Sequence, residues 1–313
     1  MTMSSLAIYN DFRRLITPIA LREVIVAHEE MKCTRQSFRE WCIALGVAED
    51  INALGTEVKD WLTIEGWRLL ESKVRGYGFG FAIGTRRVSN NIDQGKGGWS
   101  NLIRTSDIAS VNDDAYLYLA PSDEIANSFR IADESGDDCD MAHYLGIPKC
   151  CAEFFSVVWP AASRRQGDLC PYSCAMSEDY TYPWDWHTNI VSQYFGGSLI
   201  SFFPCSFQCS NARSKGEKTF KILSRINREW AKSVKAISKG IFIYTEYGGV
   251  HRWSQYILNG KQVILSGKVQ STVCDHSMSN ARIIEYSTPH DMIVHTDSQM
   301  FHLSGADVAL FIF

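Results

Sequence analysis

Seven of the chain's ten cysteines lie between Cys139 and Cys209, and six of these seven form three close sets. The sets are the adjacent pair Cys150-Cys151, the pair in Cys170-Pro-Tyr-Ser-Cys174 and the pair in Cys205-Ser-Phe-Gln-Cys209. Cysteines that serve only as small core hydrophobes are not expected to gather in this way. Grouped thiolates are what a zinc ion or an iron–sulfur cluster needs. The sequence therefore predicts a thiolate site in the middle of the chain.

The composition is that of a soluble globular protein. Apolar residues make up 45% of the 313 residues and charged residues 21%, which favours a filled core over long disorder. No apolar run is long enough to cross a bilayer, so we expect no membrane partner. The beginning of the chain mixes acidic and basic side chains and lacks a clear cleavage site, so we expect no signal peptide and a cytoplasmic location. In that reducing compartment, grouped cysteines favour metal or redox use over disulfides.

The length of the chain and the change in its residue pattern from one region to the next predict an α+β (or α/β) fold in three parts. Residues 1–110 are expected to form a mainly helical region, and residues 111–240 a cysteine-bearing α/β domain that ends in a basic helix. From residue 241 to 313 short β-branched and aromatic runs alternate with turn residues, which indicates a β-rich region.

Several elements can be placed within these parts. Helical spacing of apolar residues extends over 21–46, and a second helix is expected at 58–76. The segments 77–84 and 114–121 are typical of strands. Ser122, followed by two acidic residues, is expected to cap the next helix.

The three cysteine sets differ in their expected local structure. Gly146 and Pro148 predict a turn before the adjacent pair, with a helix beginning there whose dipole lowers a cysteine's pKa. Pro171 suits the first turn of a helix at the second set. Pro204 suggests that 198–204 enters the third set as a strand and turns there.

The spacing leaves the metal open, because neither CxxxC pair matches a zinc ribbon or a ferredoxin run. Six thiolates exceed the need of one zinc ion, so an iron–sulfur cluster is the leading hypothesis. The expected type is 4Fe-4S. Zinc is the alternative. A thiol redox relay, disulfides and plain packing are further alternatives. The first-choice ligands are Cys151, Cys205 and Cys209, and the set is completed by Cys150, Cys170 or Cys174. Three ligands and an open iron would indicate catalysis, and four would indicate structure or electron transfer.

Part of the chain resembles a group of bacterial and archaeal domains of unknown function. The residues that carry the resemblance are LGIPKCCAEFF, Asn189 and FGGSLISFFPCSFQCSNA, and it covers about 115–215. The group shares an LGYPxCC segment, an asparagine and a closing PCSxxC-like segment. The resemblance implies that Cys150, Cys151, Cys205 and Cys209 are the core set and that the CPYSC pair is an addition. It implies no activity.

Two histidines lie near the cysteines in the sequence. His143 precedes Cys150, and His187 lies between the second and third sets. Each is a candidate ligand or catalytic acid/base, although a histidine hydrogen-bonded beside the core is the plainer interpretation. Cys150 is the candidate reactive cysteine. The segment 184–189 mixes flat apolar surfaces with polar tips, as a substrate pocket or a core turn does.

A basic helix is predicted over 214–238. From Arg213 to Lys239 the chain holds nine Lys/Arg and two Glu, a local charge of 9 − 2 = +7, so the remainder carries −4 − 7 = −11. The overall charge disfavours nucleic acid as a partner. The stripe could attract a small or carrier-bound anionic substrate or dock on the acidic segment 107–140, and internal docking is slightly favoured. The predicted anion-binding residues are Lys218, Lys221, Arg225 and Arg228.

These features together favour a cytosolic iron–sulfur enzyme that acts on a small or carrier-bound anionic substrate. Sulfur transfer or lyase-type chemistry fits this reading best. The first alternative is a zinc-stapled binding module without catalytic activity, and the second is a thiol oxidoreductase.

Overall fold

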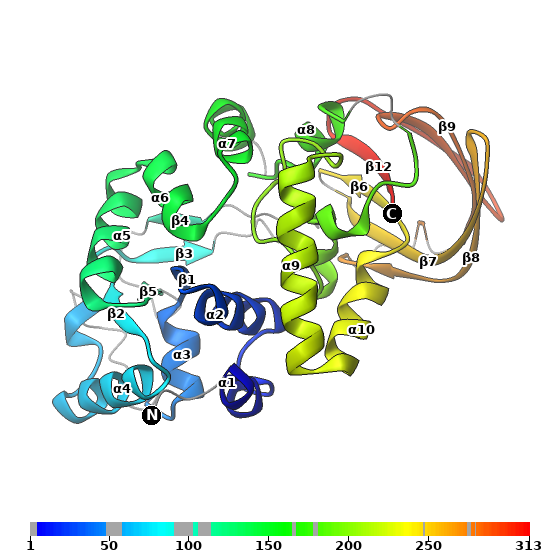
Figure 1. Ribbon diagram of the computed structural model, residues 1–313. Coiled ribbons are helices and arrows are strands. Elements are labelled where there is room, and N and C mark those ends of the chain that lie inside the picture. Colours follow the sequence, from blue (N-terminus) through cyan, green and yellow to red (C-terminus); the bar gives the residue numbers. More distant parts are fainter. Residues whose placement is uncertain are drawn as a thin grey trace. The chain divides into compact units, whose positions relative to one another are not determined.

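The computed structural model describes residues 5–47, 58–90, 103–105, 114–164, 167–177, 181–246, 248–273, 277–278 and 280–313. The chain divides into two compact units, one ending at Ala152 and the other running from Glu153 to the C-terminus (Figure 1). Every pairing between the described strands is antiparallel. Helices and antiparallel sheets in separate regions make an α+β fold, which confirms the predicted class.

The first unit combines helices with a three-stranded sheet of order β1-β5-β2 and a small β3-β4 hairpin. Its elements are α1 (Ser5–Phe12), α2 (Pro18–Glu30), β1 (Thr34–Ser37), α3 (Phe38–Ala44), η2 (Val58–Asp60), α4 (Ile64–Gly76), β2 (Gly80–Ile83), β3 (Val88–Asn90), β4 (Ile103–Thr105), β5 (Tyr116–Ala120), α5 (Asp123–Ser135) and α6 (Asp138–Leu145). The predicted cap is confirmed, because Ser122 accepts a hydrogen bond from the Ile125 amide at the start of α5.

The helical run predicted over 21–46 is wrong in its middle, where β1 interrupts it. α2 ends at Met31, whose φ of 52° is left-handed, and the chain then pairs Thr34 with Leu119 of β5. Gln36 donates a hydrogen bond to Thr34 Oγ1 at 2.7 Å, so the polar side chains of this short strand are satisfied although buried. Pairing with a buried strand far along the chain overrides the local helical spacing.

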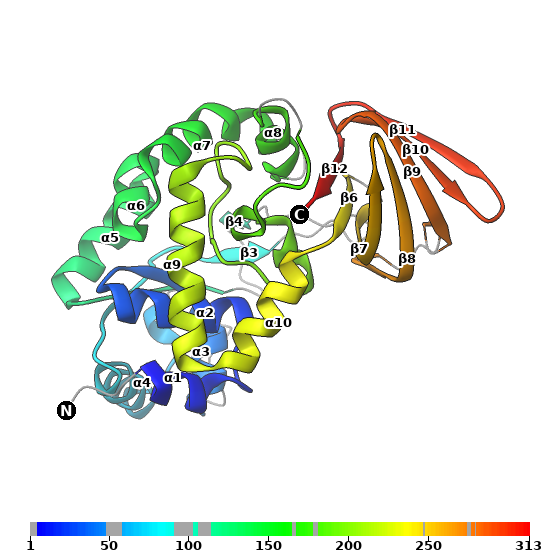
Figure 2. The same ribbon diagram turned by 45° about the vertical axis from the view of Figure 1, so that its right-hand side comes forward.

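The second unit holds helices and a curved seven-stranded sheet of order β11-β10-β9-β8-β7-β6-β12 (Figures 1 and 2). Its elements are α7 (Lys149–Ala162), α8 (Cys170–Ala175), η5 (Trp186–Thr188), η6 (Val191–Phe195), α9 (Ser210–Ile226), α10 (Arg228–Ser238), β6 (Ile241–Thr245), β7 (Gly249–Asn259), β8 (Gln262–Ser271), β9 (Ala281–Thr288), β10 (Asp291–Thr296), β11 (Met300–Ser304) and β12 (Val308–Ile312). The unit boundary falls inside α7, whose first turn belongs to the first unit.

The β-rich C-terminal region is confirmed, and a buried arginine ties the preceding helix to it. Arg252 of β7 is 5% exposed and donates to the carbonyls of Ile237 and Lys239, both at 3.0 Å. These carbonyls belong to the last turn of α10, where no helical partner remains for them. The end of α10 is therefore fixed on the sheet by hydrogen bonds.

Two predictions for the central region are corrected. The basic helix over 214–238 is two helices, because Asn227 adopts an extended backbone and its side chain caps α10 through the Trp230 amide at 2.9 Å. α10 then turns back beside α9 (Figure 2). The segment 198–204 is not a strand, and the described residues between β5 and β6 contain none.

The predicted boundaries near residues 110 and 240 stay predictions. Within the second unit, the helices that follow Glu153 and the C-terminal sheet belong to one compact body. Among the described residues, no helix has the length and apolar character that a membrane crossing requires.

Gly80 provides a test of the first unit, because a Cβ there would lie 2.2 Å from the backbone nitrogen of Asp123. We expect Gly80→Ala to lower the free energy of unfolding by about 2 kcal/mol or more, since backbone cannot move aside as a side chain can. The matched control is Gly76→Ala, where a Cβ meets nothing within 4 Å. The control should change stability by less than about 1 kcal/mol. Urea unfolding measures both, and equal stability of the two variants would contradict the close approach.

Candidate metal centre

Four cysteines from two of the predicted sets come together. The Sγ atoms of Cys150, Cys151, Cys205 and Cys209 all lie within 4.8 Å of one another, and the first two are 3.9 Å apart. All described cysteines are free thiols. These four are also the cysteines that the family resemblance implied. Together they could hold a metal ion.

The adjacent pair is positioned by α7. Pro148 precedes the helix and accepts a hydrogen bond from the Cys151 amide at 2.9 Å, so both cysteines lie in its first turn. Further along α7, Phe154 packs in a cluster with Leu169 and Cys205. The helix that carries the adjacent pair is thus fixed against the segment that carries the third set.

The third set lies on a turn that leads directly into α9. Cys209 is the N-cap of α9, and its Sγ accepts the Ala212 amide at 3.5 Å. Between the two cysteines, Phe207 is fully buried and stacks on Trp184, with ring centres 5.0 Å apart. The Phe207 amide donates to Ser177 Oγ at 3.0 Å. The turn is therefore anchored in the core by its middle residue.

Two helix N-termini meet at these sulfurs. Cys150 and Cys151 lie in the first turn of α7, and Cys209 caps α9. The positive end of each helix dipole is a favourable position for the negatively charged ligands of a metal ion. Cys151 is 1% exposed and the other three are partly exposed, so an ion can reach the centre from solvent. The arrangement supplies four sulfur ligands in a partly buried setting.

The second predicted set does not join this group. Cys170 and Cys174 both lie in α8 and are fully buried. Burial, with a further contribution from Asp168, raises the pKa of Cys170, and burial raises that of Cys174. Both side chains therefore stay protonated and pack as apolar groups. Pro171 does occupy the first turn of α8, as predicted.

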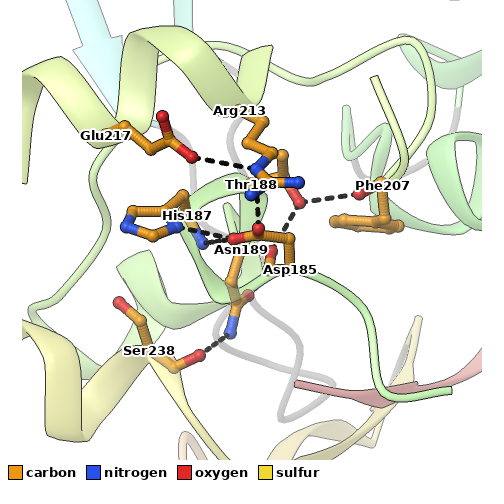
Figure 3. A network of polar contacts seen from close by, with 8 residues as sticks. All are labelled: Asp185, His187, Thr188, Asn189, Phe207, Arg213, Glu217 and Ser238. Carbon is orange, nitrogen blue, oxygen red and sulfur yellow. Dashed lines mark hydrogen bonds and ion pairs between the residues drawn. The ribbon is translucent and has the colours of Figure 1, made fainter. Parts of the chain in front are cut away.

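The two candidate histidines have different settings. His143 is exposed in the last turn of α6. His187 belongs to a second group with Asp185 and Glu217, in which one ligand atom of each lies within 4.8 Å of the others (Figure 3). Neither histidine is in the four-cysteine group.

An arginine occupies the position between the two carboxylates of the second group. Arg213 Nε lies 2.9 Å from an oxygen of Asp185 and 2.9 Å from an oxygen of Glu217. Its hydrogen bond to Glu217, together with the charge of Asp185, raises the pKa of the Arg213 guanidinium. A bound cation would have to displace this guanidinium, so we assign the group to an ion-pair network. Sequence spacing gave no signal for it, because α9 brings Arg213 and Glu217 to the turn at 185–187.

Asn189, which the resemblance included, has a structural role. It is fully buried, and its side-chain amide donates to the Ser238 carbonyl at 2.8 Å (Figure 3). Its Oδ1 accepts the Ser192 amide at 3.1 Å. The side chain thereby satisfies a carbonyl at the end of α10 and fixes the turn after His187 to that helix.

The predicted anion-binding side chains are exposed on α9 and α10, and their role stays a prediction. They are Lys218, Lys221, Arg225 and Arg228. Two members of the acidic segment are bound within the first unit, where Asp133 pairs with Arg35 at 2.7 Å and Glu134 with Arg130 at 2.5 Å.

Comparison with known proteins identifies no relative, since no family model, curated protein or solved structure matches the chain. The resemblance described above therefore stays a prediction.

Gly216 tests the contact that brings α9 to the His187 turn, because a Cβ there would lie 2.3 Å from the His187 carbonyl oxygen. We expect Gly216→Ala to destabilise the protein by about 1–3 kcal/mol despite the better helix propensity of alanine. Ser214→Ala, at an exposed position two residues earlier, should stay within about 0.5 kcal/mol of the parent. Thermal unfolding compares the variants. A Gly216→Ala protein as stable as Ser214→Ala would argue against the contact.

Proposed function

We propose that the four cysteines bind one tetrahedral zinc ion, which makes this protein a zinc-stapled module. The mutual distances of the sulfurs carry the proposal. Zn–S bonds of about 2.3 Å place the sulfurs of a tetrahedral site about 3.8 Å apart. The observed limit of 4.8 Å and the 3.9 Å between Cys150 and Cys151 are close to that value.

The same distances argue against the iron–sulfur cluster that the sequence favoured. In a four-iron cluster each thiolate binds a different iron, which places the sulfurs about 6 Å apart. Four thiolates also suit a single iron ion, but zinc binds such a set more tightly than ferrous iron does. Zinc is therefore the ion that the ligand set supports best.

The ligand count bears on the role of the ion. Four protein thiolates fill a tetrahedral shell and leave no position for a substrate, as in structural zinc sites. The ion would join the first turn of α7 to the turn that begins α9, and so fix the helices that carry the basic side chains. This supports a binding module over an enzyme with an open iron.

Metal analysis of the purified protein tests the proposal. We expect about one zinc per chain with no sulfide, and a cobalt-substituted protein should show the intense visible bands of a tetrahedral thiolate site. Cys205→Ser should lose the zinc and lower the melting temperature by about 10 °C or more. Cys139→Ser, at an exposed cysteine outside the group, is the control and should keep both the zinc and the melting temperature of the parent protein. Matched iron and sulfide in the parent protein would refute the zinc proposal.

A second substitution separates ligands from buried thiols. Cys174→Ala should cost about 1 kcal/mol of stability through lost packing and leave one zinc per chain, because this side chain is a protonated core group. The zinc content of the folded variant is the measurement. A folded Cys174→Ala protein that has lost its metal would place the CPYSC pair in the centre instead.

A further inference from the structure

The Asp185–His187 pair has the geometry of an oriented acid–base group. His187 Nδ1 lies 2.6 Å from Asp185 Oδ1, and the same oxygen accepts the His187 backbone amide at 2.9 Å. A carboxylate in this position accepts a hydrogen bond from Nδ1–H and leaves Nε2 as the basic atom of the neutral ring. The pair thus fixes both the orientation of the imidazole and its tautomer.

The carboxylate is itself held in place. Arg213 lies 2.9 Å from the second oxygen of Asp185 and pairs with Glu217 on α9 (Figure 3). Thr188 Oγ1 lies within hydrogen-bond distance of the Asp185 carbonyl, at 2.8 Å, which closes the turn. Two carboxylates and one guanidinium thus surround one side of the imidazole.

The remaining surroundings of the imidazole are aromatic. The Trp186 ring centre lies 3.9 Å from that of His187, and the Phe220 ring centre 6.2 Å away. The His187 side chain is 16% exposed. The imidazole is therefore partly accessible from solvent.

Two lysines indicate what kind of ligand this would be. Lys235 on α10 and Lys239, the residue that follows this helix, place their ammonium groups 5.5 and 5.9 Å from the centre of the Trp186 ring. Among the described residues neither has a carboxylate partner, whereas Lys232 pairs with Glu229 at 2.8 Å. The ring attracts each cation but does not neutralise it. Two like charges brought to one ring favour a bound anion.

We propose that His187, oriented by Asp185, is the proton-transfer group of a second site, whose ligand is an oxyanion drawn by Lys235 and Lys239. The site would take a phosphate, sulfate or carboxylate group borne by a small molecule. It lies on η5 and α10 and uses none of the four cysteines, so it goes beyond the proposed zinc staple and does not depend on which metal is bound. It also places the anion at the end of α10, away from the predicted set that begins at Lys218.

Nuclear magnetic resonance of ¹⁵N-histidine-labelled full-length protein tests the orientation of the imidazole. At about pH 8.5, where ordinary imidazoles are neutral, we expect the His187 proton on Nδ1 and an unprotonated Nε2. His187→Gln assigns the signal. Asp185→Asn should return the ring to the commoner Nε2-protonated form. An Nε2 proton in the parent protein would overturn the proposed role of His187.

Sulfate is the probe for the anion site, because its charge is constant over the pH range used. At fixed ionic strength we expect sulfate to shift the His187 signals with saturation in the millimolar range. Lys235→Met with Lys239→Met should weaken this response at least tenfold. The control, Lys232→Met with Lys268→Met, removes the same charge elsewhere in the unit. Its sulfate response should stay within about twofold of that of the parent protein.

Three results would overturn the anion site. The first is a His187 response that does not saturate by about 50 mM sulfate, which indicates non-specific ion binding. The second is an equal loss of the sulfate response in the two double variants. The third is a loss of the response when Lys218 and Lys221 are changed instead. All three are read from folded protein with its metal content measured, so a failure of this site is distinguished from a failure of the zinc proposal.

Discussion

The burial of Phe207 is the contact on which the geometry of the second unit depends. This ring stacks on Trp184 and meets Phe311 and Phe313 at the end of the chain, each with ring centres 5.3 Å away. Burying an aromatic ring of this size contributes on the order of 2–3 kcal/mol. Since Phe207 lies between Cys205 and Cys209, the core holds the middle of the turn and both sulfurs stay at its ends. The thiolate group is thus an outcome of hydrophobic packing before any ion is bound.

Charge repulsion among the four sulfurs opposes the packing that brings them together. Four thiolates within 4.8 Å of one another repel strongly, and the first turn of α7 and the start of α9 offset only part of this repulsion. A metal ion bound as proposed would neutralise this repulsion and stabilise the folded unit, so that packing and coordination would support each other.

The sequence predicted those elements whose signals are local. Ser122 as a cap, a helix from the adjacent cysteines onward and Pro171 in a first turn all follow from the chemistry of one or two neighbouring residues. The strand β1 was missed because it depends on pairing with β5, about eighty residues away. The break at Asn227 was missed because apolar spacing continues through it, while a single extended residue is enough to reset the helix.

The same distinction applies to the sites. Grouping along the chain identified the thiolates, but it could not separate the four that meet from Cys170 and Cys174, because only the fold shows that those two are enclosed in the core. His187 was a candidate from its residue type alone. Its partners Arg213 and Glu217 come from α9. They reach His187 because Gly216 lets that helix lie against the His187 carbonyl, an approach that the sequence does not reveal.

Two rigid connections join the thiolate turn to the His187 turn. Thr188 Oγ1 lies 2.9 Å from the carbonyl oxygen of Phe207, which stands between the two cysteines of the turn. Cys209 caps α9, and Arg213 follows one helical turn later with its guanidinium paired with Asp185. A displacement of the thiolate turn would therefore move an acceptor of Thr188 and the cation paired with Asp185 together. A metal ion bound by the cysteines, as proposed, would affect His187 without touching a ligand, because it would fix the frame in which the imidazole is oriented.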